Sequence, residues 1–451
     1  MHCEPVILAA GLGTRMRSST PKALHRLAGR ELVRWAEAAA RRAADRPPIV
    51  VIGPEMESAR GLLSGDVRFV VQTERRGTGH ALLQAAPLLK GQCDAILVTT
   101  SDMPLLSSPT LRTLIETQAS NSGPLTLLSV LAADARGFGR VVRDSAGRVT
   151  AVIEETEARP EQLAIRELNA GAYCFRSDWL WDRLAKLPIS SRGEYLLTDI
   201  VAAAAEQGGS VAAVTTPDAE EAIGINTREH LAEAEGILRR RINRTWMLAG
   251  VTIEDPSTTY IAPEVHLEAD TLVLPNSRLE GVTRIGGGSV VGPNTIVRDS
   301  TIGERCRVEA SVLEGAELAE EVHVGPFAHL RPGARLGRGV HMGNFGEVKN
   351  STLEAGVKMG HFSYVGDAVV GAEANIGAGT ITCNFDREGH KNRTEIGPGA
   401  FIGSDSLLVA PVRVGRGAVT GAGSVVTRDV PDGGLVVGMP ARAVQAKGNR
   451  G

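Results

Sequence analysis

Over its first 226 residues the chain alternates short apolar runs with longer amphipathic stretches. Val, Ile and Leu dominate the short runs, which predict strands, and the longer stretches repeat apolar positions at helical spacing. The expected strands cover residues 47–53, 68–73, 95–102 and 125–132, and the expected helices cover 30–46 and 110–118. This alternation is typical of a mostly parallel sheet with helices on both faces. We therefore predict a Rossmann-like α/β domain over residues 1–226, with its ligand at the carboxyl ends of the strands.

Residues 227–249 carry mixed charges, no proline, and apolar residues at helical intervals. This pattern predicts a long helix that links two domains. Arg239, Arg240 and Arg241 are consecutive within it. They could form a binding patch, but charged residues on a helix more often form a solvated face, and we favour that interpretation.

From residue 250 to residue 451 the hydrophobic pattern changes to a period of six. An aliphatic residue followed by a glycine or another small residue recurs through residues 285–296, 324–341, 370–381, 396–407 and 414–425. This period predicts a parallel β-helix of hexapeptide repeats, in which the aliphatic side chain enters a narrow core. A glycine-rich linker would not keep Ile, Val and Leu at a fixed period.

The hexads become irregular over residues 341–367, and a polar segment at 382–395 precedes the return of the period at Ile396. Insertions into a repeat protein commonly carry its binding face. We expect a second site in these stretches.

The hexads also explain an unusual composition. The chain has 52 glycines and only 4% aromatic residues, because bulky rings do not fit a narrow β-helix core. A net charge of −3 argues against a basic nucleic-acid-binding surface, so a nucleotide partner would be a small ligand. The five cysteines lack any C-x-x-C spacing and suit reduced thiols. The first residues show no basic region followed by a long apolar one, and no apolar run approaches the length of a membrane span. We expect a cytoplasmic protein without a membrane partner.

A glycine-containing stretch, LAAGLGTRMRSSTPKALH, begins at Leu8, within the first predicted strand, Val6–Ala9, and continues beyond it as a loop. Met16 stands where a dinucleotide fingerprint needs its third glycine, and no Walker G-K-[ST] occurs. Glycine amides beside Arg15 and Lys22 could form a phosphate cradle, or the segment could be a plain turn with solvated charges. The proline before Lys22 and the position after the first strand favour the phosphate cradle.

Asp102 follows the apolar run AILV directly. A carboxylate at a strand end, facing this loop, suits Mg²⁺ bound to phosphates, because Mg²⁺ prefers oxygen ligands. Asn226 could supply a second oxygen, or it could cap the linking helix. Both interpretations of Asn226 remain open at this point.

Six motifs occur in the order LAAGLGTRMRSSTPKALHRLAG, VQTERRGTGHA, SDMPL, GFGRV, ELNAG and GIN. In this order they resemble the sugar-1-phosphate nucleotidyltransferases. With the hexads added, the chain from Val6 to Arg428 resembles the family of bifunctional N-acetylglucosamine-1-phosphate uridyltransferases/glucosamine-1-phosphate N-acetyltransferases. The resemblance implies a left-handed β-helix, Mg²⁺ as cofactor, UTP and acetyl-CoA as substrates, and a homotrimer with acetyltransferase sites between neighbouring β-helices.

The resemblance also implies roles for residues of the first domain. Arg15 and Lys22 would contact phosphates during catalysis, and Asp102 and Asn226 would bind Mg²⁺. Gly139, Glu154 and Asn169 would contact the acetylated sugar. The remaining nucleotide contacts would be Leu8, Ala9, Ala10, Gly11, Gln72, Gly77, Thr78 and Ser101. Ser101 departs from the glycine that is usual in the family.

In the β-helix, His361 alone would be interpreted as a solvated side chain. However, several cations and amides occur in the same stretch, and a phosphosugar needs such partners. They are Arg331, Lys349, Tyr364, Asn375 and Asn384. Histidine is a natural general base for an amine that attacks a thioester.

The resemblance makes His361 that base and gives the glucosamine-1-phosphate contacts to Arg331, Lys349, Tyr364 and Asn375. It gives the acetyl-CoA contacts to Ala378, Asn384, Phe385, Ser404, Ala422 and Arg442. Phe385 stands where the family usually has Tyr. Met439 stands where a family member has Arg, so Arg442 is the expected substitute.

We therefore predict a bifunctional enzyme that acetylates glucosamine-1-phosphate and then couples the product to UTP, giving UDP-N-acetylglucosamine for the cell envelope. One alternative is a single-activity nucleotidyltransferase whose β-helix is only an oligomerisation scaffold, and His361 and Lys349 argue against it. Another is a regulatory protein with a decayed site, which Asp102, Lys22 and Arg15 argue against.

Overall fold

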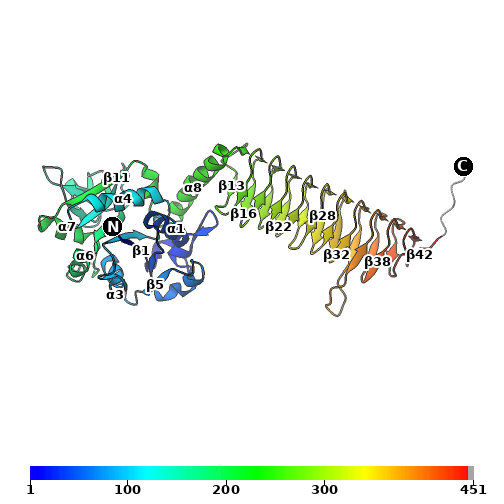
Figure 1. The fold of residues 1–451 in the computed structure, drawn as a ribbon, viewed down its shortest axis with the longest axis horizontal. Coiled ribbons are helices and arrows are strands. Elements are labelled where there is room, and N and C mark those ends of the chain that lie inside the picture. Colours follow the sequence, from blue (N-terminus) through cyan, green and yellow to red (C-terminus); the bar gives the residue numbers. More distant parts are fainter. Residues whose placement is uncertain (192, 445–451) are drawn as a thin grey trace. The chain divides into compact units, whose positions relative to one another are not determined.

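The computed structural model describes residues 1–191 and 193–444. The chain forms two compact units that divide between Leu238 and Arg239, within helix α8 (Arg228–Leu248). Figure 1 shows a sheet with helices on both sides in unit 1 and a stack of flat coils in unit 2. Within the described ranges, no helix combines the length and the apolar character needed to cross a membrane.

Seven strands of unit 1 form a sheet in the order β11-β7-β10-β6-β1-β4-β5, with the hairpin β8-β9 attached to β10. Along this order only β10 runs antiparallel to its neighbours, so the prediction of a mostly parallel sheet is confirmed. The strands are β1 (Cys3–Ala9), β4 (Ile49–Ile52), β5 (Arg68–Val71), β6 (Ala95–Thr100), β7 (Leu125–Leu131), β8 (Arg140–Arg143), β9 (Val149–Ile153), β10 (Glu167–Arg176) and β11 (Val211–Thr216), with a separate pair β2 (Arg26–Leu27) and β3 (Arg30–Glu31).

Both faces of this sheet are buried. Val6 and Leu8 of β1 share a core with α2, α6 and α7, whereas Ile7 and Ala9 pack against α1. Successive strand residues point to opposite faces, so burial of both faces explains why the strands appear in the sequence as continuous apolar runs. The helices are α1 (Leu32–Ala44), α2 (Thr78–Leu83), α3 (Ala86–Leu89), α4 (Ser108–Ser120), α5 (Pro160–Leu163), α6 (Ser177–Leu184) and α7 (Asp199–Glu206), with 3-10 turns η1 (Thr14–Met16), η2 (Lys22–Leu24), η3 (Pro54–Gly61) and η4 (Ala219–Ala222).

Unit 2 is a left-handed parallel β-helix with three sheets, each built from every third strand. The first sheet contains β12 (Thr252–Ile253), β15 (Leu272–Val273), β18 (Val290–Val291), β21 (Arg307–Val308), β24 (His323–Val324), β27 (His341–Met342), β30 (Lys358–Met359), β33 (Asn375–Ile376), β36 (Phe401–Ile402), β39 (Val419–Thr420), β41 (Leu435–Val437) and β42 (Arg442–Ala443). The second contains β13 (Tyr260–Ile261), β16 (Arg278–Glu280), β19 (Ile296–Arg298), β22 (Val312–Glu314), β25 (His329–Leu330), β28 (Gly346–Lys349), β31 (Ser363–Gly366), β34 (Ile381–Cys383), β37 (Leu407–Val409) and β40 (Val425–Val426). The third contains β14 (His266–Leu267), β17 (Arg284–Ile285), β20 (Thr301–Ile302), β23 (Glu317–Leu318), β26 (Arg335–Leu336), β29 (Thr352–Leu353), β32 (Ala368–Val370), β35 (Thr394–Ile396) and β38 (Val412–Val414).

The hexads place one aliphatic side chain per face into the core, as predicted. Val273, Leu279 and Ile285 are six residues apart, and each is at most 1% exposed. Hydroxyl side chains two positions before them are buried as well, and Ser277 and Thr283 donate to backbone carbonyls at 2.7 Å. These hydroxyls donate hydrogen bonds to backbone carbonyls in the turns, which are buried in the narrow coil and cannot reach water.

Only one of the two expected interruptions changes the coil. Residues 341–367 keep the three-sheet stacking through β27 to β31, so the predicted break there is wrong. The segment between β34 and β35 leaves the coil as a projecting loop, closed by a bridge between Phe385 and Lys391 (Figure 1).

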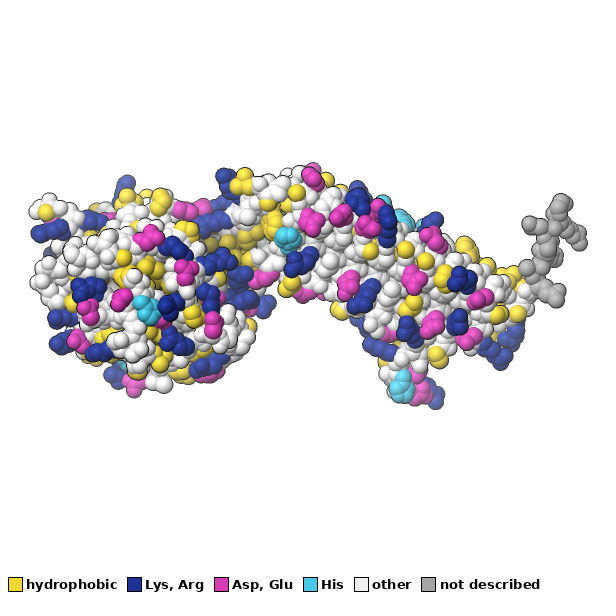
Figure 2. Space-filling model, in the orientation of Figure 1, with side chains coloured by type: hydrophobic (Ala, Val, Ile, Leu, Met, Phe, Trp, Pro, Cys, Tyr) yellow, Lys and Arg dark blue, Asp and Glu magenta, His cyan; other side chains and the backbone are white. Residues whose placement is uncertain are grey.

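On the face drawn in Figure 2, Lys and Arg side chains are interspersed with Asp and Glu. On the second sheet of unit 2, for example, Arg298 lies between Glu280 and Glu314, at 2.9 and 2.8 Å. Charges of both signs are therefore mixed on this face.

Candidate functional sites

Three segments that are far apart in the sequence meet at the carboxyl ends of β1 and β6. The Lys22 Nζ atom lies 2.5 Å from Oδ2 of Asp102 and 3.1 Å from Oδ1 of Asn226. The N–H of Ile225 donates to the backbone carbonyl of Asp102 at 2.8 Å, which holds Asn226 beside it. A carboxylate oxygen and an amide oxygen therefore converge on one cation.

The two interpretations of Asn226 can now be separated. Helix α8 is capped by Thr227, whose Oγ1 accepts the N–H of His230 at 3.2 Å. The side chain of Asn226 instead faces Lys22. The interpretation of Asn226 as the cap is therefore wrong.

Asp102 is held in its charged form. Burial opposes ionisation, but the Lys22 ammonium, its hydrogen bond, and a further one from Thr100 (Oγ1 to Oδ1, 2.6 Å) keep the pKa of the carboxyl below its usual range. An ionised carboxylate and an amide oxygen, both directed at one cation, fit the oxygen ligands that Mg²⁺ prefers.

The glycine loop closes over Lys22. Gly13 has φ 63°, and a Cβ atom there would overlap the Lys22 side chain, so both conformation and space require glycine. Leu8, Ala9 and Ala10 are buried at the end of β1, and Gly11 is exposed with open space beside it. Arg15 is also exposed and forms no ion pair within the described residues.

The other predicted nucleotide residues lie along the same edge. The Gln72 amide donates to the carbonyl of Gly77 at 3.2 Å, and the hydroxyl of Thr78 accepts the N–H of Leu197 at 3.0 Å. The N–H of Ser101 donates to the carbonyl of Leu8 at 3.0 Å.

The three predicted sugar residues belong to a second network. The N–H of Asn169 donates to the carbonyl of Gly139 at 2.8 Å, and Oε1 of Glu154 accepts the hydroxyl of Thr198 at 2.9 Å. The side-chain amide of Asn169 donates to the hydroxyl oxygen of Tyr173 at 2.7 Å. Burial, and then the nearby Glu154 charge, raise the pKa of Tyr173, so its hydroxyl keeps its proton.

In unit 2, three cations gather near the C-terminal ends of strands β25 and β28, in the middle of the second sheet. Arg331 lies one coil before Lys349. The backbone N–H of Arg331 donates to the carbonyl of Val348, the residue next to Lys349, at 2.9 Å. Lys391, on the projecting loop, and then Arg331 lower the pKa of Lys349 by repulsion. Glu347 pairs with Arg331 at 2.8 Å, and the Asp367 charge only partly offsets the repulsion at Lys349. Such a cluster suits a bound dianion.

Tyr364 lies one coil beyond this cation cluster. Its strand pairs with the preceding one so that Lys349 lies opposite Gly366, and a Cβ atom on Gly366 would overlap the Tyr364 hydroxyl. The phenol therefore folds over Gly366 toward the Lys349 position.

His361, Ala378, Ser404 and Ala422 occupy the same corner, between the first and second sheets, on four successive coils. A glycine precedes each of them, and Cβ atoms on Gly377 and Gly403 would overlap the backbone of the next coil. His361, Ser404 and Ala422 are exposed and Ala378 is half-buried, so small side chains form a track that begins at His361. Asn375 lies on β33, the strand that leads into the corner at Ala378.

The remaining predicted acetyl-CoA residues are spread out. Asn384 is 7% exposed and donates its amide to Asp367, whereas Phe385 is 67% exposed on the projecting loop. Arg442 is exposed on β42, at the end of the first sheet.

Residues 5–160 match the family model of the MobA-like NTP transferase domain, and residues 393–428 match six bacterial transferase hexapeptide repeats. The bifunctional protein GlmU of Pelobacter propionicus is 44% identical over 436 residues, which cover 96% of this chain and 95% of that protein. The bifunctional protein GlmU of Heliobacterium modesticaldum is 45% identical, with 96% and 94% covered, and that of Exiguobacterium sibiricum is 41% identical, with 97% of each covered. The chain belongs to the bifunctional GlmU family.

In this GlmU-family chain, sequence reasoning missed several residues beside the two sites. Tyr173 and Thr198 contact the predicted sugar residues, and nothing in the linear pattern distinguishes them from core positions. Lys391 lies in the inserted polar segment, whose position in the sequence could have revealed it.

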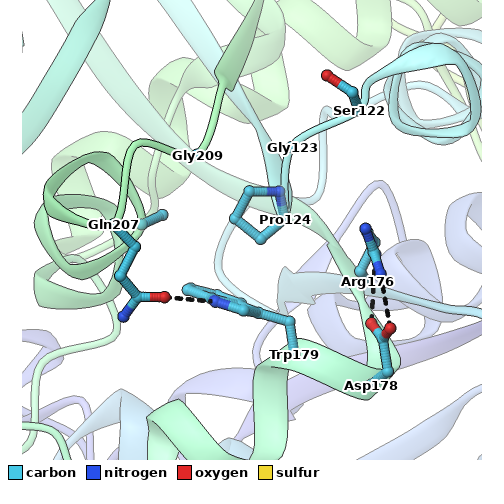
Figure 3. A pocket seen from close by; sticks show the side chains of 9 residues that line it. Ser122, Gly123, Pro124, Arg176, Asp178, Trp179, Gln207 and Gly209 are labelled. Atoms are coloured by element: carbon cyan, nitrogen blue, oxygen red, sulfur yellow. Dashed lines mark hydrogen bonds and ion pairs between the residues drawn. The ribbon is translucent and has the colours of Figure 1, made fainter.

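A separate pocket of about 340 Å³ opens elsewhere on unit 1 of this GlmU-family chain (Figure 3). The indole of Trp179 donates to Gln207 at 3.1 Å on one side, and Arg176 pairs with Asp178 at 2.6 Å on the other. Pro124, just before β7, lines it too, so the pocket lies at the opposite edge of the sheet from Asp102. It contains no predicted site residue.

Proposed function

We propose that the chain catalyses both reactions that its sequence predicts: acetyl transfer from acetyl-CoA to glucosamine-1-phosphate, and uridylyl transfer from UTP to N-acetylglucosamine-1-phosphate. The observation that carries the proposal is the convergence of Asp102 and Asn226 on the cation of Lys22, in a chain of the GlmU family. The cation cluster and His361 in unit 2 support the acetyl step.

In unit 1, an oxygen of the sugar phosphate attacks the α-phosphorus of UTP, and the bond from that phosphorus to pyrophosphate breaks. Lys22 and Arg15 supply positive charge to the phosphates, and the sugar residues hold the attacking group in place. Mg²⁺ held by Asp102 and Asn226 would neutralise further phosphate charge. Positioning and electrostatics supply most of the rate, since phosphoryl transfer needs little covalent help from the protein.

In unit 2, the amine of glucosamine-1-phosphate attacks the carbonyl carbon of the thioester. The nitrogen–carbon bond forms, the carbon–sulfur bond breaks, and coenzyme A leaves as the thiol. His361 takes the proton that the amine loses and returns it to the departing sulfur. Arg331 and Lys349 hold the sugar phosphate, and the track of Ala378, Ser404 and Ala422 accommodates acetyl-CoA.

We further propose the functional boundaries 1–226, 227–249 and 250–451, a homotrimer, and a cytoplasmic location. The exposed His361 and the half-buried Lys349 support the trimer, because an acetyltransferase site open on one β-helix can be completed by another. All five cysteines are free thiols, as suits the reducing cytoplasm.

One purified sample tests the proposal. Glucosamine-1-phosphate, acetyl-CoA, UTP and Mg²⁺ are supplied together, and free thiol and pyrophosphate are followed separately. We expect thiol release without UTP, and pyrophosphate release only when the acetylated sugar is formed or added. A sample that releases pyrophosphate from added N-acetylglucosamine-1-phosphate but never releases thiol would leave the β-helix as a scaffold.

A further inference from the structure

Strand β10 carries a bulge at the proposed sugar site. Against β7, Asn169 lies opposite Ser129 and Tyr173 lies opposite Leu127. An advance of four residues along β10 therefore matches an advance of only two residues along β7. In a regular strand, the Cα atoms of residues four apart are separated by about 13 Å, and their side chains point the same way without meeting. Here the Asn169 side-chain nitrogen lies 2.7 Å from the Tyr173 hydroxyl. Gly171, at φ 70° inside the bulge, brings the two side chains together.

Tyr173 is fixed by the core of unit 1. The residue is 2% exposed, and its ring stacks on Phe175 with 5.5 Å between ring centroids. The hydroxyl is therefore the one polar group of a side chain that is otherwise buried among apolar residues. It accepts a hydrogen bond from the side-chain amide of Asn169. A buried hydroxyl without a partner is costly, so this contact is retained in the folded protein.

The contacts of Asn169 define what it can offer a ligand. One N–H goes to Tyr173, and its carbonyl oxygen accepts the N–H of Gly171 at 3.3 Å. A side-chain amide has two donor hydrogens and two acceptor lone pairs, so one of each remains. A secondary amide, such as the acetamido group of the sugar, offers the complementary acceptor and donor.

We propose that Tyr173 is a positioning residue for the acetylated sugar, which locks the Asn169 amide through the bulge of β10. The proposal rests on the proposed function and deepens it. On this proposal, the Tyr173 hydroxyl beneath the site fixes the orientation of the Asn169 amide before the ligand binds.

Tyr173→Phe removes only this hydroxyl and keeps the ring. We expect the KM for N-acetylglucosamine-1-phosphate to rise about five- to tenfold, the loss of one oriented hydrogen bond. The KM for UTP and thiol release by unit 2 should stay unchanged, because Tyr173 touches neither site. Pyrophosphate release is measured with each substrate varied in turn.

Thr126→Val is the matched control. It removes another buried hydroxyl of unit 1, which donates to Gln118 at 2.7 Å on the opposite face of the sheet from Tyr173. We expect it to lower the Tm while leaving both KM values unchanged. A Tyr173→Phe protein whose two KM values rise together, or whose sugar KM does not rise, overturns the proposal. Failure of the proposed function is distinct, because then the wild type itself releases no pyrophosphate.

Discussion

The two sites are built on opposite principles. In unit 1 the polar side chains are already paired with one another: Lys22 with Asp102 and Asn226, and Asn169 with Tyr173. In unit 2, His361, Ser404 and Ala422 are exposed at corners of a repeating coil. A sheet with loops of different lengths can gather distant segments into one network. A solenoid repeats one position from coil to coil, so its residues form rows along the surface, and an insertion such as the projecting loop adds a group from outside the row.

The sharpest way to break this comparison is Asp102→Ala. It removes the carboxylate on which Lys22 and the proposed Mg²⁺ depend, so we expect pyrophosphate release to fall about a thousandfold. Thiol release should persist, because Asp102 belongs to unit 1. Stopped assays with each product measure both effects.

Asp94→Ala serves as its control. This residue lies at the other end of β6, where its carboxylate accepts the backbone N–H of His2 at 2.7 Å. It should retain both activities. Equal loss of thiol release in Asp102→Ala would contradict the independence of the two units.

The second prediction concerns the exposed base. His361→Ala should lower thiol release by about a hundredfold, the usual contribution of a general base, and leave pyrophosphate release from added N-acetylglucosamine-1-phosphate intact. His341→Ala, an exposed histidine on the preceding coil, is the control. A similar loss in both variants would show that the effect is structural.

These predictions also mark what the sequence could and could not provide. The period of six predicted the β-helix because one buried aliphatic per face is a strict geometric demand, met by Val273 and Leu279. The alternation of apolar runs with amphipathic stretches in residues 1–226 predicted the sheet, because strands buried on both faces must be apolar throughout. Tyr173 could not be found, because its role depends on a two-residue register shift that no local pattern encodes.

The same limit applies to Asn226. Its two interpretations were equal in the sequence, since an asparagine before a helix is a common cap. The cap that Thr227 provides and the contact with Lys22, over 200 residues away, separated them. The prediction that the coil is interrupted over residues 341–367 was wrong because it relied on local spacing alone. Glycines such as Gly343, which depart from the regular hexads, fit the corners of an unbroken coil.

The third prediction tests the cation cluster. Lys391 and Arg331 lower the pKa of Lys349, so Lys349 loses its charge at a lower pH than an isolated lysine. As pH rises through that lowered pKa, affinity for glucosamine-1-phosphate should fall. Lys391→Ala should raise its KM about tenfold at neutral pH and move the alkaline fall to higher pH. A pH series of thiol-release KM measures this, and an unmoved alkaline limb would exclude Lys391 from the cluster.

The smallest effect is expected from Phe385→Tyr, which adds the hydroxyl that the resembled family usually has. Phe385 is 67% exposed on the projecting loop, so in one chain the new hydroxyl gains only solvent. We expect the KM for acetyl-CoA to change less than about twofold, since an exposed hydrogen bond replaces one to water. A larger fall would mean that the hydroxyl meets a partner that a single β-helix does not supply. Unit 2 would then differ from unit 1 in needing a second chain to complete its site.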